Sequence, residues 1–347
     1  MNGFGYAARE TGHRRVPAPP QRMTGTILLM APAFYVISDM PGAGGEHGAP
    51  GEGVPAIRIP PYVIALPHAS KGTISTTMSS RLLLGARSRL RQIRRRMMAF
   101  QARNLGFTAT LKTGEGANPA RNRIFVARRY LRGSGIEVGA LHNPLPVPRC
   151  AVVRYVDRMS ASDLPRQYPE LAHESLTDPD VIDDGEKLAS FGDASVDFVI
   201  ANHFIEHCED PIGALIQFMR VTRPGGIVYI AVPDKRHTFD RSRALTTVEH
   251  VVTDHTRGPE QSRRQHFVEF AATMKNLVGD PEYEKTIHLL QDPDFLQSTN
   301  YSIHYHVWDH QAFLAFLSQV RDLFGIPFDI DFALRNGVET IAILRHH

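Results

Sequence analysis

Cysteine is scarce in this sequence, which has only Cys150 and Cys208 among its 347 residues. The two do not form a Cys-x-x-Cys pair. Their scarcity excludes a disulfide framework and a cysteine-rich zinc site. We therefore expect a cytoplasmic protein, in a compartment that keeps thiols reduced.

Long apolar runs are also missing. The apolar stretch from Ile27 to Ile37 is shorter than the roughly 20 residues that a membrane-spanning helix needs, and Pro32 interrupts it. The pair Arg14-Arg15 lacks the surrounding sequence of a twin-arginine export signal. We expect neither a membrane span nor an export signal.

Acidic residues are few in the first part of the chain. Residues 1–105 hold 14 Lys/Arg against 4 Asp/Glu, whereas the rest of the chain holds 25 against 32. Residues 1–75 are rich in Gly and Pro and show no helical or strand period. We predict that residues 1–95 are a disordered or wrongly assigned extension and that one domain fills residues 96–347.

The basic residues of the first part are almost all arginine. Of the 14, 13 are Arg, as translation of GC-rich DNA upstream of a true start would give, and Met78, Met97 or Met98 would then be the initiator. The basic stretch at 87–96 is compatible with an amphipathic helix that touches nucleic acid or anionic lipid. A solvated helix leading into the domain is the interpretation that we favour.

From residue 124 onward, strand and helix signals alternate. Short apolar runs at 135–138, 151–156, 196–201 and 227–232 have the length of strands that are covered on both faces. Alternation of this kind indicates a parallel sheet with covering helices.

Helix and hairpin signals complete this pattern. Asp210 can cap a helix that starts at Pro211, and Arg223-Pro-Gly-Gly226 would end it. A second helix carries an apolar face from Phe313 to Phe324, and Asn336-Gly337 predicts a β-hairpin after it. We predict an α/β fold, a doubly wound, Rossmann-like, mostly parallel sheet of about seven strands that ends in an antiparallel hairpin.

The loops that follow the strands are the places to look for a ligand, because ligands of open α/β sheets bind beyond the carboxyl ends of the strands. Gly139 follows the first strand, where glycine permits a tight turn and close approach of the backbone to a ligand. Asp157 ends the second strand, where a carboxylate can accept both hydroxyls of a ribose. Together they favour a nucleotide-like ligand.

Several linked motifs then follow in order. Asp183-Asp-Gly-Glu-Lys-Leu188 precedes the run from Phe191 to His207, which contains an Asp-x-Val strand and ends in Glu-His, and Arg223-Pro-Gly-Gly226 follows the next helix. This order resembles the class I S-adenosylmethionine (SAM)-dependent methyltransferases with small-molecule substrates. The stretch Glu137-Val-Gly-Ala-Leu-His-Asn-Pro-Leu-Pro146, with Val232-Pro-Asp-Lys-Arg-His-Thr-Phe-Asp240, also resembles uncharacterised bacterial members, some of which accompany glycosyltransferases.

The resemblance implies SAM as the cofactor and assigns residues to it. Glu137, Gly139 and Ala140 are assigned to the methionine part of SAM, and Asp157 to its ribose. Asp184, Gly185 and Glu186 are assigned to the adenine, and Asn202 and His203 to the surroundings of the sulfonium. The sequence departs from the family in one respect, because Leu141 and Asn143 stand where the usual Gly-x-Gly-x-Gly turn has its later glycines.

The loop that follows the apolar run at 227–232 is long and polar, and we predict that residues 234–306 form a lid over the acceptor site. Methyl transfer to a hydroxyl needs an aligned acceptor and a base that removes its proton. Histidine suits this task because imidazole titrates near neutral pH. The candidate bases are His203, His237, His304 and His306.

These histidines also permit a metal site. His304 and His306 are spaced to lie on one face of a strand, and Glu249-His250 with Asp254-His255 could complete a ligand set. The spacing matches no defined zinc motif, so we favour a hydrogen-bonded polar lid and predict no metal.

The leading prediction is a SAM-dependent O-methyltransferase that acts on a small polar molecule or a glycan-linked sugar. A nucleic-acid methyltransferase is the alternative, favoured by the basic residues before 105 and disfavoured by the acidic excess of the domain. A third possibility is a non-catalytic SAM-binding module, which the single Gly139 permits. We do not expect a nucleic-acid partner, and the sequence does not give the oligomeric state.

Overall fold

The computed structural model describes residues 118–277 and 286–347, with shorter pieces at 26–29, 34–37, 90, 92–93, 95–100, 111 and 113. The prediction for residues 1–95 therefore falls largely outside the described residues. In the basic stretch at 87–96, residues 90, 92–93 and 95–96 are described and are helical, with Leu90 and Ile93 exposed. Within the short pieces, β1 (Thr26–Leu29) pairs antiparallel with β2 (Phe34–Ile37), a strand pair that was not predicted. None of the described helices is long and apolar enough to cross a membrane.

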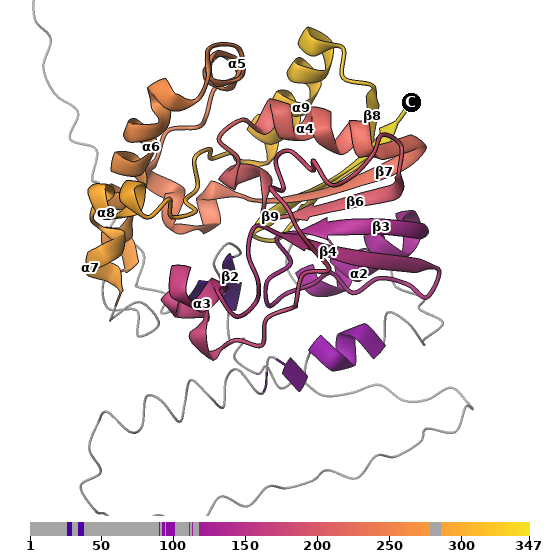
Figure 1. Ribbon diagram of the computed structural model, residues 1–347, viewed down its shortest axis with the longest axis horizontal. Helices are drawn as coiled ribbons and strands as arrows, with labels where there is room; N and C mark the ends of the chain where they lie inside the picture. The colour runs from indigo at the N-terminus through magenta and orange to yellow at the C-terminus, as the bar shows by residue number, and fades with distance from the viewer. Residues whose placement is uncertain are drawn as a thin grey trace, which may run out of the picture.

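A seven-stranded sheet forms the centre of the fold, as predicted (Figure 1). Its order is β5-β4-β3-β6-β7-β9-β8, and only the pairs that β9 makes with β7 and β8 are antiparallel. The strands are β3 (Gly133–Val138), β4 (Ala151–Asp157), β5 (Val181–Ile182), β6 (Val196–Asn202), β7 (Thr222–Pro233), β8 (Phe328–Asn336) and β9 (Glu339–His346). The order of the strands reverses between β3 and β6, where α/β sheets of this kind bind their ligands.

The central strands of the sheet carry apolar side chains on both faces, and helices cover both faces. Val199 and Ala201 pack in one apolar cluster with α4 (Pro211–Val221) and α9 (His310–Phe324). Phe198 and Ile200 point to the opposite face and pack with α2 (Pro119–Tyr130). Figure 1 shows α4 and α9 on one side of the sheet and α2 on the other.

The helix ends follow the local sequence. The Asp210 side chain accepts a hydrogen bond from the backbone N–H of Gly213 at 2.8 Å and caps α4, with Pro211 in the first position, as predicted. Asp309 caps α9 in the same way, through the N–H of Ala312. The predicted hairpin joins β8 to β9 through Gly337, which has a φ of 65°.

A helical insertion follows β7 and occupies the region that was predicted to be a lid. It contains η3 (Lys235–His237), η4 (Phe239–Ser242), α5 (Val248–Arg257), α6 (Glu260–Thr273), η5 (Met274–Leu277), α7 (Ile287–Leu290) and α8 (Pro293–Ser298). Phe267 and Phe270 of α6 pack with Leu164 of α3 (Leu164–Gln167) and with Leu171 of η1 (Pro169–His173). This apolar cluster holds the insertion beside the loop that follows β4.

Residues 301–308 return the chain from the insertion to α9. The backbone N–H groups of Tyr305 and His306 both donate to the carbonyl of Glu206, at 2.9 and 3.2 Å, in η2 (Ile205–His207). Trp308 stacks on Phe316 of α9 with 5.1 Å between ring centroids. The return segment is therefore fixed to the loop after β6 at one end and to α9 at the other.

Candidate active site

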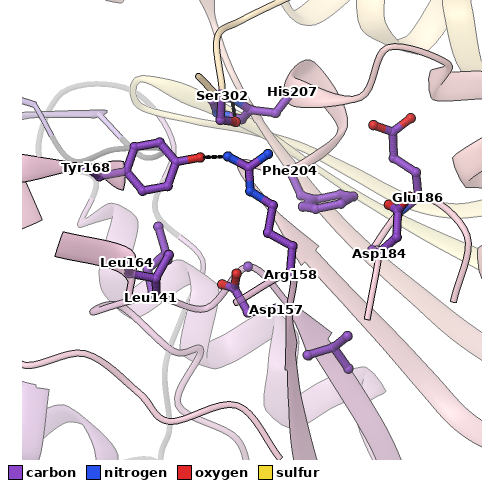
Figure 2. Close-up of a pocket in the computed structure, with 13 residues that line it drawn as sticks. Leu141, Asp157, Arg158, Leu164, Tyr168, Asp184, Glu186, Phe204, His207 and Ser302 are labelled. Carbon is purple, nitrogen blue, oxygen red and sulfur yellow. Dashed lines mark hydrogen bonds between the residues drawn. The ribbon is translucent and has the colours of Figure 1, made fainter. Parts of the chain in front are cut away.

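A pocket lies at the carboxyl ends of the parallel strands, where the strand order reverses (Figure 2). It holds about 790 Å³ of empty space, part of which is open to solvent. The pocket is lined by Gly139, Leu141, Val156, Asp157, Arg158, Leu164, Tyr168, Asp184, Gly185, Glu186, Phe204, His207 and Ser302.

Two of these residues must be small. Gly139 has a φ of 64°, a conformation that costs other residues about 1–2 kcal/mol, and a Cβ there would lie 3.3 Å from the Phe204 ring. At Gly185 a Cβ would lie only 2.6 Å from Cζ of Phe204. The backbone at Gly185 therefore approaches the Phe204 ring too closely for a Cβ, and at Gly139 the backbone conformation and a tight contact together favour glycine.

Asp157 is one of the three carboxylates in the pocket lining, with Asp184 and Glu186. Burial raises its pKa to about 6, and hydrogen bonds from the backbone of Met159 and Arg158 oppose this rise. Arg158 follows it and donates a hydrogen bond to the Tyr168 hydroxyl, as Figure 2 shows. Asp157 is thus ionised at neutral pH and can accept hydrogen bonds from a ligand.

Glu186 supports the pocket from the loop after β5. Its two carboxylate oxygens accept from the backbone N–H groups of Glu209 and Asp210, each at 3.2 Å. Burial raises the pKa of Glu186 to about 7, although the hydrogen bonds from the two backbone N–H groups act to lower it. The side chain therefore ties the loop after β5 to the start of α4.

His207 brings an imidazole to the pocket wall. Its Nδ1 lies 3.1 Å from Oγ of Ser302, and its ring makes an edge contact with that of His304, with 4.7 Å between centroids. Nδ1 of His304 lies 2.6 Å from Oδ2 of buried Asp240. Burial acts to raise the pKa of Asp240, but His304 and Arg243 outweigh it and hold that pKa below its ordinary value. A carboxylate thus fixes the ring that packs behind His207.

The residues that the sequence assigned to the cofactor divide into two groups. Gly139, Asp157, Asp184, Gly185 and Glu186 line the pocket, whereas Glu137, Ala140, Asn202 and His203 are not in its lining. Glu137 instead accepts a hydrogen bond from the N–H of Leu145 at 2.9 Å, and Nδ2 of Asn202 lies 3.5 Å away from it. Glu137 therefore holds the turn after β3, and its pKa is raised by burial to about 7.

The four predicted bases lie in different surroundings. His203 is buried with its Nε2 2.8 Å from Oε2 of Glu339, and His237 is exposed on η3. His304 packs against His207 of the pocket wall, and His306 lies among other histidines. None of the four lines the pocket itself, and their role as bases stays a prediction.

Sequence reasoning missed several residues of the pocket. Phe204 and His207 lie within the motif run that ends in Glu-His, and Arg158 directly follows Asp157, so nearby motifs could have indicated them. Tyr168 lies between α3 and η1, Ser302 lies in the return segment, and no local pattern marks either of them.

Comparison with known proteins gives one family match. Residues 138–230 match a model described as a methyltransferase domain. This segment runs from the end of β3 into β7 and contains most of the residues that line the pocket. Residues 138–230 thus carry a methyltransferase domain. Its cofactor is SAM, and the two glycines beside Phe204 and the carboxylate of Asp157 are compatible with that ligand.

The solved structures that are similar to this chain share little sequence with it. A SAM-dependent methyltransferase from Methanosarcina mazei is 14% identical and covers 63% of this chain and 95% of its own, with a TM-score of 0.30. One from Aquifex aeolicus is 10% identical and covers 65% and 88%, with a TM-score of 0.34. A structure named for Zn-dependent alcohol dehydrogenases of Rhodobacter sphaeroides is 15% identical and covers 72% and 96%, with a TM-score of 0.41. No curated protein matches the chain.

Proposed function

We propose that the methyltransferase domain methylates a hydroxyl oxygen of a small polar molecule or a glycan-linked sugar, with a histidine as the base. One observation carries this proposal: His207 and Ser302 lie in the wall of the same pocket as Asp157 and Gly139. Bound SAM supplies a methyl group that its sulfonium has already activated. What the chain must add is a binding site, an aligned acceptor and a proton acceptor.

The residues that would hold the cofactor come from three strand ends. Asp157 would accept hydrogen bonds from the ribose hydroxyls, because it is a buried carboxylate at the end of β4. Gly139 would let the backbone approach the methionine part, and Asp184 with Gly185 would adjoin the adenine. Each of these residues lines the pocket, which supports the assignment.

His207 is the base that the geometry favours. If its Nδ1–H donates to Oγ of Ser302 at 3.1 Å, then Nε2 is the atom that takes the proton of the acceptor. His304, held by Asp240, packs on the ring of His207 and limits its movement. His304 thus acts as a positioning residue in this proposal, whereas His203, His237 and His306 are the candidates that the experiment below compares with His207.

The net charge of residues 106–347 favours a small acceptor over nucleic acid. Residues 106–347 hold 32 Asp/Glu against 25 Lys/Arg, an excess of negative charge that disfavours a polyanion such as nucleic acid. The insertion at 234–306 contributes Ser302 to the pocket wall, as a lid over the acceptor would. We therefore place the acceptor between the pocket and this insertion.

The test is methyl transfer from radiolabelled SAM to a panel of free sugars, glycosides and small polyols. We expect an alkali-stable product, because methyl ethers resist the base that cleaves methyl esters. His207→Ala should lose about 100-fold or more of the turnover, as removal of a general base does, with little change in the affinity for SAM. The matched control is His173→Ala, at an exposed position outside the pocket lining.

The possible outcomes separate the alternatives. Full turnover in His207→Ala, with loss in His203→Ala, His237→Ala or His306→Ala, would assign the base to one of those residues instead. Tight binding of SAM with no product from any acceptor would favour the non-catalytic module. Labelled RNA or DNA in place of a small product would identify the chain as a nucleic-acid methyltransferase.

A further inference from the structure

Three imidazoles and one carboxylate meet inside the helical insertion, outside the pocket lining. His250 and Asp254 lie one turn apart on α5, so their side chains share a face of that helix. His266 comes from α6, and His306 comes from the return segment at 301–308. Asp254, His266 and His306 are buried, and His250 is half-buried at the edge of the group.

The separations within this group suit a single metal ion. Nε2 of His250 lies 3.1 Å from Nε2 of His266 and 3.2 Å from Oδ2 of Asp254, and the latter two atoms are 3.8 Å apart. One ligand atom from each of the four residues, His306 included, lies within 4.8 Å of every other. Ligands about 2.0–2.1 Å from a tetrahedral zinc ion are about 3.3 Å from one another.

The neighbouring groups orient these side chains inward. Oγ of Ser262 donates to Oδ1 of Asp254 at 2.7 Å, while Oδ2, which accepts no hydrogen bond from the described residues, faces the imidazoles. Nδ1 of His266 and both ring nitrogens of His306 are buried and make no hydrogen bond within the described residues. The hydrogen bond from Ser262 is of the kind that holds metal-binding side chains from outside, and a metal ion would satisfy buried ring nitrogens that have no other partner.

Burial favours the neutral form of two of these rings, because it lowers the pKa of His266 to about 4 and the pKa of His306 well below its ordinary value. A neutral imidazole offers a nitrogen lone pair to a cation.

We propose that His250, Asp254, His266 and His306 bind one zinc ion. Three imidazoles with one carboxylate favour zinc and its transition-metal neighbours over magnesium or calcium. Four protein ligands leave no open position, so this is a structural site. The ion would join α5 and α6 to the return segment, which fixes the insertion beside the methyltransferase pocket. The proposal does not depend on the acceptor, and it is compatible with any of the candidate bases except His306.

The test uses the full chain, stripped with a chelator and then titrated with zinc alone. We expect one zinc per chain after desalting, a higher melting temperature with zinc, and the visible absorption of tetrahedral cobalt after Co²⁺ substitution, with no binding of Mg²⁺. His266→Ala and Asp254→Asn should weaken zinc binding by more than the roughly 10–100-fold that loss of an outer-shell partner costs. His255→Ala is the matched control, because His255 lies on the same helix but contacts Asp210.

Two results would overturn the proposal. The first is a stripped chain that takes up no zinc and melts at the same temperature with or without it. The second is unchanged zinc binding in His266→Ala or, if that variant does not fold, in His250→Gln at the half-buried edge of the group. A second set of close side chains, Glu206, His207 and His304, adjoins the pocket, and loss of zinc in His304→Ala alone would place the ion there instead.

Discussion

Nε2 of His203 lies 2.8 Å from Oε2 of Glu339, at the point where the loop after β6 meets the hairpin of β8 and β9. Glu339 also accepts from Nε of Arg123 at 2.8 Å, and all three side chains are buried. His203 has a φ of 51°, an uncommon conformation for a residue other than glycine. A buried carboxylate thus holds a histidine that the sequence places beside the cofactor.

Loss of the Glu339 charge should destabilise the fold in a pH-dependent way. Burial acts to raise its pKa, but Arg123 and His203 together lower it to about 2. A lowered pKa means that the stabilisation is complete above the ordinary value of about 4.5 and is lost as the pH falls toward 2. Glu339→Gln should lower the free energy of unfolding at pH 7 by about 3–5 kcal/mol, because it leaves Arg123 buried without its counter-ion.

Denaturant unfolding at about pH 7 and about pH 4 checks this expectation. The deficit of Glu339→Gln relative to the native chain should shrink at the lower pH. Asp329→Asn, at an exposed carboxylate on β8, should change stability by less than about 1 kcal/mol at both. A deficit that is the same at the two pH values would mean that the charge of Glu339 does not stabilise the fold.

His203→Gln should separate a structural role from a catalytic one. The substitution removes the ring that donates to Glu339, so we expect a lower melting temperature. Turnover in the methyl-transfer assay should stay within about tenfold of the native value if His207 is the base. An unchanged melting temperature together with a loss of about 100-fold in turnover would instead make His203 the base.

SAM affinity should depend on pH through Asp157. Its pKa is about 6, so the carboxylate that would accept the ribose hydroxyls becomes protonated as the pH falls below that value. Calorimetry should show a Kd that rises up to tenfold for each pH unit below about 6. Asp157→Asn should bind weakly at all pH values without this dependence. The control is Asp193→Asn, at an exposed carboxylate, which should behave like the native chain. A Kd for Asp157→Asn that changes with pH as the native Kd does would exclude Asp157 from the ribose site.

Gly185→Ala should weaken SAM binding more than it weakens the fold. The added Cβ would lie 2.6 Å from Cζ of Phe204, so the ring must move within the pocket that it lines. Gly192→Ala is the matched control, because a Cβ at Gly192 has no atom within 4 Å. We expect a Kd for SAM at least tenfold higher in Gly185→Ala alone. Equal affinities in the two variants would show that Phe204 does not shape the cofactor site.

Part of this molecule was predictable because its signals are local. Asp210 and Pro211 mark the start of α4, and the apolar runs of the central strands indicate burial on both faces. Gly139 and Asp157 were found because they follow strands, and the ends of parallel strands meet at one edge of a sheet.

The rest depends on contacts between distant parts of the chain. Ser302 reaches the pocket only because the return segment is bonded to Glu206, nearly a hundred residues earlier. The sequence suggested that His306 and His250 could share a metal with Asp254, but His266 joins them only through the packing of α6. His203 turns toward Glu339 through a backbone conformation that no motif encodes.

The return segment at 301–308 divides its side chains by odd and even position. Tyr301, Ile303 and Tyr305 enter the apolar cluster of the insertion. Ser302, His304 and His306 lie at the pocket, behind His207 and in the proposed zinc site, in that order. Deletion or insertion of one residue here would exchange inward and outward positions on one side of the change, so a single change could remove more than one of the polar roles that substitutions remove one at a time. The length of this segment is therefore constrained more strictly than the identity of any one of its residues.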